Sequence, residues 1–203
     1  MHNTRYDHAP RLPLEGPIDL NAIVAGSGPL MLEIGPGRGA FTLDYAERHP
    51  DHRVVAMEIR RKWATVLDER FTQRKLTNAR CFAEDAGAVL PRVGPDGCVA
   101  MAAVHFPDPW WKKRHAKRLV VQDSFVDDLA RLLAPGAVLL VQTDVEERAA
   151  QYRERLDAHP ALERGYEGEG AAESPFAPSR SNREKRAIED GLPITRLVYR
   201  KRG

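Results

Sequence analysis

The stretch HFPDPWWKKRH, residues 105–115, places one acid between two prolines and in front of a cationic run. Pro107 and Pro109 fix the backbone φ angle on either side of Asp108, so its carboxylate is presented rigidly. An apolar run at 98–104 leads into this stretch and predicts a strand that ends beside the acid. A rigid carboxylate at the end of a buried strand is suited to binding or chemistry.

Positive charge is concentrated in two stretches. Residues 112–118 (KKRHAKR) hold five Lys or Arg and no acid, and residues 179–203 hold eight Lys or Arg against three Asp or Glu. The net charge of the chain is only +2, so the remaining residues are acidic overall. Two basic islands on an acidic protein favour a polyanionic partner bound at a defined place, although a solvated surface is the simpler explanation of either island alone. Trp110 and Trp111 are suited to stacking on a base, with core packing as the alternative.

A glycine-rich turn, EIGPGRGA at 33–40, follows one predicted strand and opens a predicted helix. Gly35, Gly37 and Gly39 let the backbone turn tightly and approach a ligand closely. With the alanine that follows, the turn also satisfies a relaxed G-x-G-x-x-A dinucleotide pattern. Alone, it does not separate NAD from S-adenosylmethionine, or either of them from a tight turn without a ligand.

Acids accompany three successive predicted strands. Glu58 ends the second strand, where a carboxylate can accept hydrogen bonds from both hydroxyls of a ribose, and Asp85 ends the third, where it can accept from the amine of an adenine. Glu33, just before the glycine turn, can face the amino-acid end of a cofactor. Three carboxylates suit the cations and the adenosine of S-adenosylmethionine and suit a pyrophosphate poorly, because like charges repel. Helix N-capping is the alternative for each acid taken alone.

Alternating strands and helices must position these residues. The predicted strands span residues 29–35, 53–59, 79–85, 98–106, 137–144 and 194–201, the last alternating like a partly exposed strand after a loop-like stretch at 165–182. The predicted helices span residues 40–50, 61–76, 119–133 and 145–157. This spacing, with uniformly apolar strands, predicts a doubly wound α/β domain whose mostly parallel sheet binds ligands at the carboxyl ends of its strands. We expect one such domain at 28–203 after an irregular segment at 1–27.

Composition limits the class of protein. A chain of 203 residues with 42% hydrophobic and 30% charged residues fits one soluble globular domain. The apolar runs are too short to cross a bilayer, and the N-terminal residues lack the basic and apolar regions of a signal peptide. Cys81 and Cys98 form no CxxC pattern, which favours reduced thiols and a cytoplasmic protein. The seven histidines show no metal-ligand spacing, so we expect no metal site. Because the apolar runs are short, we also expect no membrane association.

In this order and spacing, LEIGPGRG, MEI, AED, FPDPWWKKRHAKRL and QTD resemble the bacterial tRNA (guanine-N7)-methyltransferases, from about residue 30 to the C-terminus. The FPDPW-x-K-x-RH-x-KR block is the most specific element. The resemblance implies S-adenosylmethionine as cofactor, tRNA as partner, and methylation of N7 of guanosine 46 in the variable loop. It also implies a class I, Rossmann-like methyltransferase domain, with a seven-stranded sheet and an antiparallel C-terminal strand. The sequence leaves open whether the protein is a monomer or a homodimer.

The resemblance also implies a role for individual residues. Asp108 is the expected catalytic acid beside the methyl group. The residues expected to hold the cofactor are Asp108 itself with Glu33, Gly35, Gly37, Gly39, Glu58 and Asp85. The residues expected to contact the substrate or RNA are Lys112, Arg114, His115, Lys117, Arg118, Asp144, Ser181, Asn182, Arg183 and Glu184.

This sequence departs from the family pattern at several places. The family's C-terminal T-x-[FY]-E-x-R element corresponds to SNREKR, so Ser181 replaces a threonine and Arg183 replaces an aromatic. Trp111 stands where the family often has Pro or His, and the family's N-terminal Arg-rich segment is missing.

The expected chemistry makes few demands on proton transfer. Guanine N7 carries a free lone pair and no proton, so no base is needed to activate it. The site must align donor and acceptor and stabilise the cation that forms on the purine, which a nearby carboxylate such as Asp108 does.

Three other functions compete with this one. A methyltransferase of the same fold acting on a small molecule or a protein is disfavoured by the basic island at 112–118. A catalytically inactive RNA-binding module is disfavoured by the intact acids Glu33, Glu58, Asp85 and Asp108. An NAD-linked oxidoreductase would leave FPDPW without a role, and the sequence shows no acid–base pair for hydride chemistry.

Overall fold

The computed structural model of the chain describes residue 6 and residues 8–107, 120–169 and 174–203. Asp108, Trp110 and Trp111 lie outside the described residues, as does the first basic island with Lys112, Arg114, His115, Lys117 and Arg118. The predictions made for these residues therefore stay predictions.

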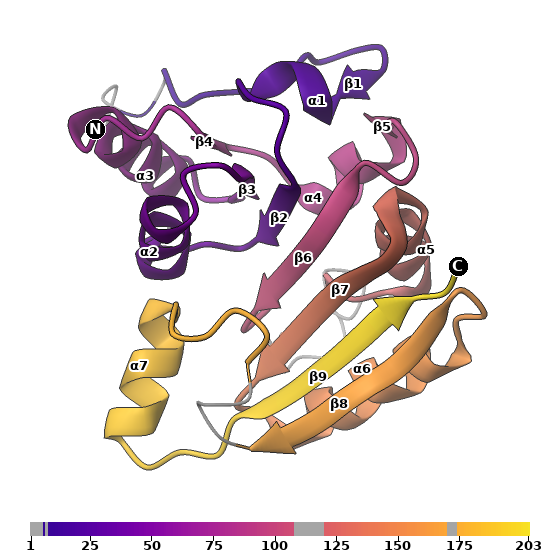
Figure 1. The fold of residues 1–203 in the computed structure, drawn as a ribbon. Helices are drawn as coiled ribbons and strands as arrows, with labels where there is room; N and C mark the ends of the chain where they lie inside the picture. The colour runs from indigo at the N-terminus through magenta and orange to yellow at the C-terminus, as the bar shows by residue number, and fades with distance from the viewer. Residues whose placement is uncertain (1–5, 7, 108–119, 170–173) are drawn as a thin grey trace.

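One large sheet organises the fold (Figure 1). Its strands are β2 (Leu30–Ile34), β3 (Arg53–Met57), β4 (Ala79–Phe82), β6 (Val99–His105), β7 (Leu133–Thr143), β8 (Leu162–Glu169) and β9 (Thr195–Lys201). They lie in the order β4-β3-β2-β6-β7-β9-β8. The first five in this order are mutually parallel, whereas β9 is antiparallel to both of its neighbours. This confirms the predicted mostly parallel seven-stranded sheet with an antiparallel C-terminal strand.

Helices follow the parallel strands and cover the sheet. The longer ones are α2 (Ala40–Arg48), α3 (Arg61–Gln73), α5 (Asp123–Leu132), α6 (Glu146–Ala158) and α7 (Asn182–Glu189). The short elements are β1 (Ile18–Asp19), α1 (Leu20–Ile23), α4 (Ala86–Val89), the 3-10 turn at Leu90–Arg92 and β5 (Val93–Gly94). No helix in the described parts of the chain has the length and apolar character needed to span a membrane.

Successive side chains of the inner strands point to opposite faces and build two cores. Met31 packs in the cluster that contains Phe41 of α2 and Leu67 of α3. Leu32, the next residue, packs in the cluster that contains Phe125 of α5 and the side chains of α6. Because a strand alternates its side chains, a uniformly apolar strand is buried on both faces, as the sequence predicts.

The register of the parallel strands brings their carboxyl ends to one edge. Ile34 of β2 is level with Met57 of β3 and with Val104 of β6, and Met57 is level with Phe82 of β4. Residues that follow these strands therefore meet at the same edge of the sheet, where the sequence places the candidate ligand-binding residues.

The C-terminal third differs from the sequence prediction. The stretch at 165–182 was expected to be a loop, yet β8 occupies its beginning and α7 starts at its last residue. The strand at 194–201 was expected to be partly exposed, yet β9 lies inside the sheet between β7 and β8. The alternation of ITRLVYRK is misleading because one of its polar residues, Arg196, is only 1% exposed and pairs with a buried acid, Glu184.

The N-terminal segment forms more structure than the expected irregular one. β1 pairs in parallel with β5, and α1 follows β1 directly. Ile18, Leu20 and Val24 are buried in the same core cluster as α5 and α6. The expected domain boundary at residue 28 stays a prediction.

Candidate functional site

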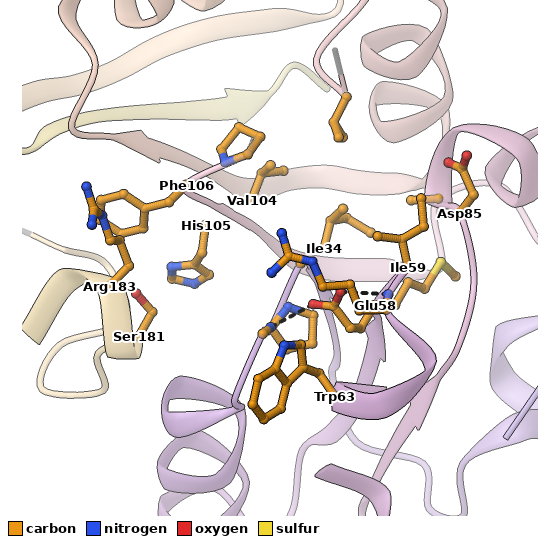
Figure 2. A pocket seen from close by; sticks show the side chains of 18 of the residues that line it. Ile34, Glu58, Ile59, Trp63, Asp85, Val104, His105, Phe106, Ser181 and Arg183 are labelled. Atoms are coloured by element: carbon orange, nitrogen blue, oxygen red, sulfur yellow. Dashed lines mark hydrogen bonds between the residues drawn. The ribbon is translucent and has the colours of Figure 1, made fainter. Parts of the chain in front are cut away.

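A cavity of about 1160 Å³ opens at the carboxyl ends of the parallel strands. Its walls come from the segments that follow β2, β3, β4, β6 and β7, and from the start of α7. In Figure 2, Glu58, Ile59 and Asp85 line one side, and His105, Ser181 and Arg183 line the other. The cavity collects eight of the predicted residues, namely Gly35, Gly37, Glu58, Asp85, Asp144, Ser181, Asn182 and Arg183.

The glycines of the turn after β2 have two different tasks. Gly35, Gly37 and Gly39 have φ angles of +75°, +56° and +75°, in the left-handed region that favours glycine. Gly35 and Gly37 line the cavity, and a Cβ at Gly37 would meet no other atom within 4 Å. A Cβ at Gly39 would lie 2.2 Å from Leu67 Cδ1, so this glycine permits α3 to pack against the start of α2. Gly39 is thus a packing residue rather than part of the cavity wall.

Glu58 holds the glycine turn in shape. Its carboxylate accepts hydrogen bonds from the backbone N–H of Gly37 at 2.9 Å and of Arg60 at 2.8 Å. The side chain lines the cavity although only 6% of the residue is exposed. A carboxylate has about four acceptor positions, so two remain for a ligand.

Asp85 combines the two tasks that the sequence left as alternatives. It is the N-cap of α4, and its Oδ1 accepts from the backbone N–H of Gly87 at 3.0 Å. The residue is also exposed and lines the cavity, which leaves its second oxygen available. Ile59, at 63% exposure, lies on the same wall (Figure 2). An exposed apolar side chain between two acids suits the flat face of a purine.

Glu33 lies next to the lining of the cavity rather than in it, and the expectation that it faces the amino-acid end of a cofactor stays a prediction. It is completely buried, and its Oε2 accepts from Thr42 Oγ1 at 2.5 Å. The neighbouring cavity residue is His105, whose Nε2 lies 3.8 Å from Glu33 Oε1. Because side chains alternate along a strand, Glu33 enters the same face of the sheet as Met31, toward α2.

Burial makes Glu33 and His105 a neutral pair. Desolvation raises the pKa of Glu33 to about 8, against the opposing effect of the hydrogen bond from Thr42. Desolvation, with the nearby charge of Arg196, lowers the pKa of His105 to about 3. Neither side chain is charged at pH 7, so their contact is not an ion pair.

The opposite wall of the cavity is made by the start of α7 and the end of β7. Asp144, directly after β7, pairs with the guanidinium of Arg183. Asn182 Oδ1 accepts from the backbone N–H of Ala40 at 3.3 Å, which joins α7 to the first residue of α2. The C-terminal helix is thereby attached to the glycine-turn side of the cavity.

Ser181 and Glu184 close a capping box at the start of α7. Ser181 Oγ accepts from the backbone N–H of Glu184 at 3.1 Å, and Glu184 Oε2 accepts from the backbone N–H of Ser181 at 3.4 Å. Glu184 is 1% exposed and supports the cavity residues Ser181 to Arg183 from within, and its expected contact with the substrate stays a prediction. The S-x-x-E spacing is the sequence signal for this helix start.

Several cavity residues were missed by sequence reasoning. They include Arg38, Ile59, Arg60, Trp63, His105, Phe106, Gln122 and Ser124. Phe106 has a φ angle of +45°, a strained conformation for a residue with a side chain, directly before Pro107. The helical pattern at 61–76 indicates that Trp63 is near an end of a helix, but no local pattern indicates that it faces a ligand.

A metal centre finds no support in the described residues. Their His, Cys, Asp and Glu side chains form no group of three or more that is placed to hold a metal ion.

Solved structures share this fold. TrmN from Thermus thermophilus superposes with a TM-score of 0.63 at 21% sequence identity, over 87% of this chain and 45% of that one. A SAM dependent methyltransferase from Aquifex aeolicus superposes with a TM-score of 0.59 at 16% identity, over 87% of this chain and 84% of that one. The fold is that of the class I, S-adenosylmethionine-dependent methyltransferases.

Sequence comparison identifies the family within this class. A family model described as "Putative methyltransferase" matches residues 27–197. A tRNA (guanine-N(7)-)-methyltransferase from Myxococcus xanthus is 40% identical, over 90% of this chain and 88% of its own length. One from Aromatoleum aromaticum is 37% identical, over 92% of this chain and 71% of its own length. The chain therefore belongs to the tRNA (guanine-N(7)-)-methyltransferase family, whose methyl donor is the predicted cofactor, S-adenosylmethionine.

Proposed function

We propose that the protein transfers the methyl group of S-adenosylmethionine to N7 of a guanine in tRNA, and that the guanine is at position 46 of the variable loop. One observation carries the proposal. A single cavity has Gly37, Glu58 and Asp85 on one wall and Asp144 with Arg183 on the other, in a chain of this family. The first wall is suited to an adenosine and the second to a guanine, so one cavity can hold donor and acceptor together.

The first wall fits the cofactor by the chemistry of its groups. Glu58 retains acceptor positions for the ribose hydroxyls after binding the two backbone N–H groups. Asp85 has a second carboxylate oxygen for the adenine amine, and Ile59 offers an apolar surface to the purine ring. S-adenosylmethionine supplies an electrophilic methyl group on a sulfonium when it is bound.

The second wall is suited to the Watson–Crick edge of guanine. That edge presents two donors, N1–H and N2–H, and a carboxylate accepts both at once. Asp144 is the carboxylate of this wall, and its side chain is only 10% exposed. Binding this edge turns N7, on the other side of the purine, away from Asp144 and toward the rest of the cavity.

The chemical step requires alignment and charge stabilisation rather than a base. N7 attacks with its lone pair, and the purine becomes cationic as the new bond forms. A carboxylate near the purine stabilises the transition state more than the ground state. We assign this role to Asp108, which follows the cavity residue Pro107 in the chain.

Cationic residues at the cavity rim support an RNA substrate. Arg38 and Lys62 are exposed and lie over the ring of the cavity residue Trp63, at 5.2 and 5.0 Å from its centre. Cations held on an aromatic surface beside a cavity suit the phosphates and bases of an unpaired strand. The first basic island, with Lys112, Arg114, His115, Lys117 and Arg118, adds to this charge in our proposal.

The test is to map methylation on defined RNA. The purified protein is incubated with S-adenosylmethionine and an unmodified tRNA transcript, and N7-methylguanosine is located by chemical cleavage and mass spectrometry. We expect one modified position, guanosine 46, and none in a transcript with adenosine at that position. Modification elsewhere would refute the assignment of position 46, and binding of S-adenosylmethionine without methylation of any tRNA would refute the activity.

A further inference from the structure

Two residues of the proposed guanine site, Asp144 and Arg183, form a salt bridge with each other. Arg183 donates to the carboxylate of Asp144, and both residues line the cavity (Arg183 is labelled in Figure 2). A guanine edge and a guanidinium both require the acceptor positions of this carboxylate. The pair seen here therefore competes with the substrate interaction proposed for Asp144.

The two partners differ in their contact with water. The Asp144 side chain is 10% exposed, whereas that of Arg183 is 52% exposed. Asp144 is largely desolvated and requires a donor, since an unpaired carboxylate in such a place is costly. Arg183 reaches solvent, so breaking the salt bridge costs little free energy if another donor replaces the guanidinium on Asp144.

The backbone of Arg183 is held in place, so that only its side chain is free to change partner. On one side, Asn182 is bonded to the start of α2. On the other, Glu184 is bonded to Arg196 at 2.6 Å and completes the capping box. A long flexible side chain on a fixed stem can exchange one anion for another without moving α7.

We propose that Arg183 couples recognition of the guanine base to recognition of a neighbouring phosphate. When RNA enters, the guanidinium of Arg183 transfers to a phosphate of the substrate strand, which it matches in a two-pronged geometry. The N1–H and N2–H groups of guanine then replace it on Asp144. This inference rests on the proposed function and adds a specificity device to it.

The exchange discriminates in two ways. A guanine without a phosphate displaces Arg183 from Asp144 but offers the guanidinium no new anionic partner, so it binds weakly. An adenine presents an acceptor at N1 and has no N2 amino group, so it cannot give Asp144 the two adjacent hydrogen bonds that replace Arg183.

The experiment compares guanosine with guanosine monophosphate on the purified protein with S-adenosylhomocysteine present, so that no methyl transfer occurs. Binding is measured by ligand-detected NMR for the wild type and for Arg183→Gln. We expect the wild type to bind the monophosphate about tenfold or more tighter than the nucleoside. In Arg183→Gln the nucleoside binds tighter than in the wild type, and the preference for the phosphate disappears.

Arg186→Gln is the matched control, since Arg186 is an exposed arginine of the same helix that lies outside the cavity lining and contacts Asp190. This control should keep the wild-type preference, and Asp144→Asn should weaken binding of both ligands. Equal losses for both ligands in Arg183→Gln, or an unchanged preference, would overturn the inference. Because this assay needs no turnover, it decides the exchange separately from the methylation assay that decides the proposed function.

Discussion

Arg196 of β9 donates a 2.6 Å hydrogen bond to Glu184 of α7, and the two side chains are 1% and 2% exposed. The second oxygen of Glu184 accepts from Gln142 Nε2 at 3.2 Å, and the same nitrogen lies 2.7 Å from His105 Nδ1. A line of buried polar groups thus runs from the interior of the sheet to the cavity wall at His105. It fixes α7, and with it Ser181 to Arg183, relative to the strands.

The first prediction concerns this buried pair. Glu184→Ala leaves the guanidinium of Arg196 buried without its carboxylate, which should lower the free energy of unfolding by about 3–5 kcal/mol. The double variant Glu184→Leu with Arg196→Met removes both charges and should recover much of that loss. Urea denaturation measures both. A single variant with wild-type stability would show that the pair does not hold α7 in place.

The second prediction concerns the cofactor. Glu58→Gln removes the charge that binds the glycine turn and is proposed to bind the ribose, so the Kd for S-adenosylmethionine should rise about 10- to 100-fold. Glu47→Gln is the control, because Glu47 lies on α2 away from the cavity lining and pairs with Arg74. Calorimetry distinguishes the two variants. Equal affinities for the cofactor in both variants would show that Glu58 does not bind the cofactor.

The third prediction concerns the proposed catalytic acid. Asp108→Ala and Asp108→Asn should lower the single-turnover rate of methylation about 100-fold or more, because the cationic purine loses its stabilising charge. The free energy of unfolding should change little. The rate is measured at saturating tRNA and cofactor, so that weaker binding is not mistaken for slower chemistry. A near-wild-type rate in either variant would contradict the assignment.

The fourth prediction uses the pH dependence of stability. In the unfolded chain Glu33 loses its proton near its ordinary pKa of 4.5, whereas burial holds the folded pKa at about 8. Between these values the folded state retains a proton that the unfolded state has released. The contribution of this residue to stability is therefore full below pH 4.5 and falls as pH rises, by about 1.4 kcal/mol per pH unit at most, until the folded pKa is reached.

The variant Glu33→Gln removes this titration. Its free energy of unfolding should exceed that of the wild type by a margin that grows between pH 5.5 and about pH 8 and is constant above that range. His105 contributes in the opposite direction, through a folded pKa of about 3 and an ordinary value of 6.5, but it does so equally in both proteins. Urea denaturation across this range measures the difference. A margin that is independent of pH would show that Glu33 is ionised in the folded protein.

That Gly37, Glu58 and Asp85 meet at one cavity was largely predictable from sequence. Gly37, Glu58 and Asp85 stand directly after apolar strands, and parallel strands bring the residues that follow them to one edge. Ile59 and Trp63 were not predictable, because neither belongs to the core clusters whose periodic pattern marks buried side chains.

The C-terminal part was less predictable because its pattern depends on tertiary pairing. Arg196 and Glu184 look solvent-exposed in a local window, and only the fold brings them together in the interior. The same pairing explains why β9 resembles a partly exposed strand. The burial of Glu33 beside α2 was not predictable for a related reason, since the turn after β2 does not reveal which face of the sheet the preceding side chain enters.

The position of β9 has a consequence for how the protein is made. β8 has β9 as its sheet partner, and β9 also covers the edge of β7, yet β9 is the last of the seven strands to be synthesised. Until then β7 presents an unpaired edge and β8 has no neighbour, a situation that favours pairing with other chains. A nascent chain halted before Thr195 would therefore expose an unpaired sheet edge, and α7 gains its hydrogen bond to Arg196 only after β9 has been synthesised.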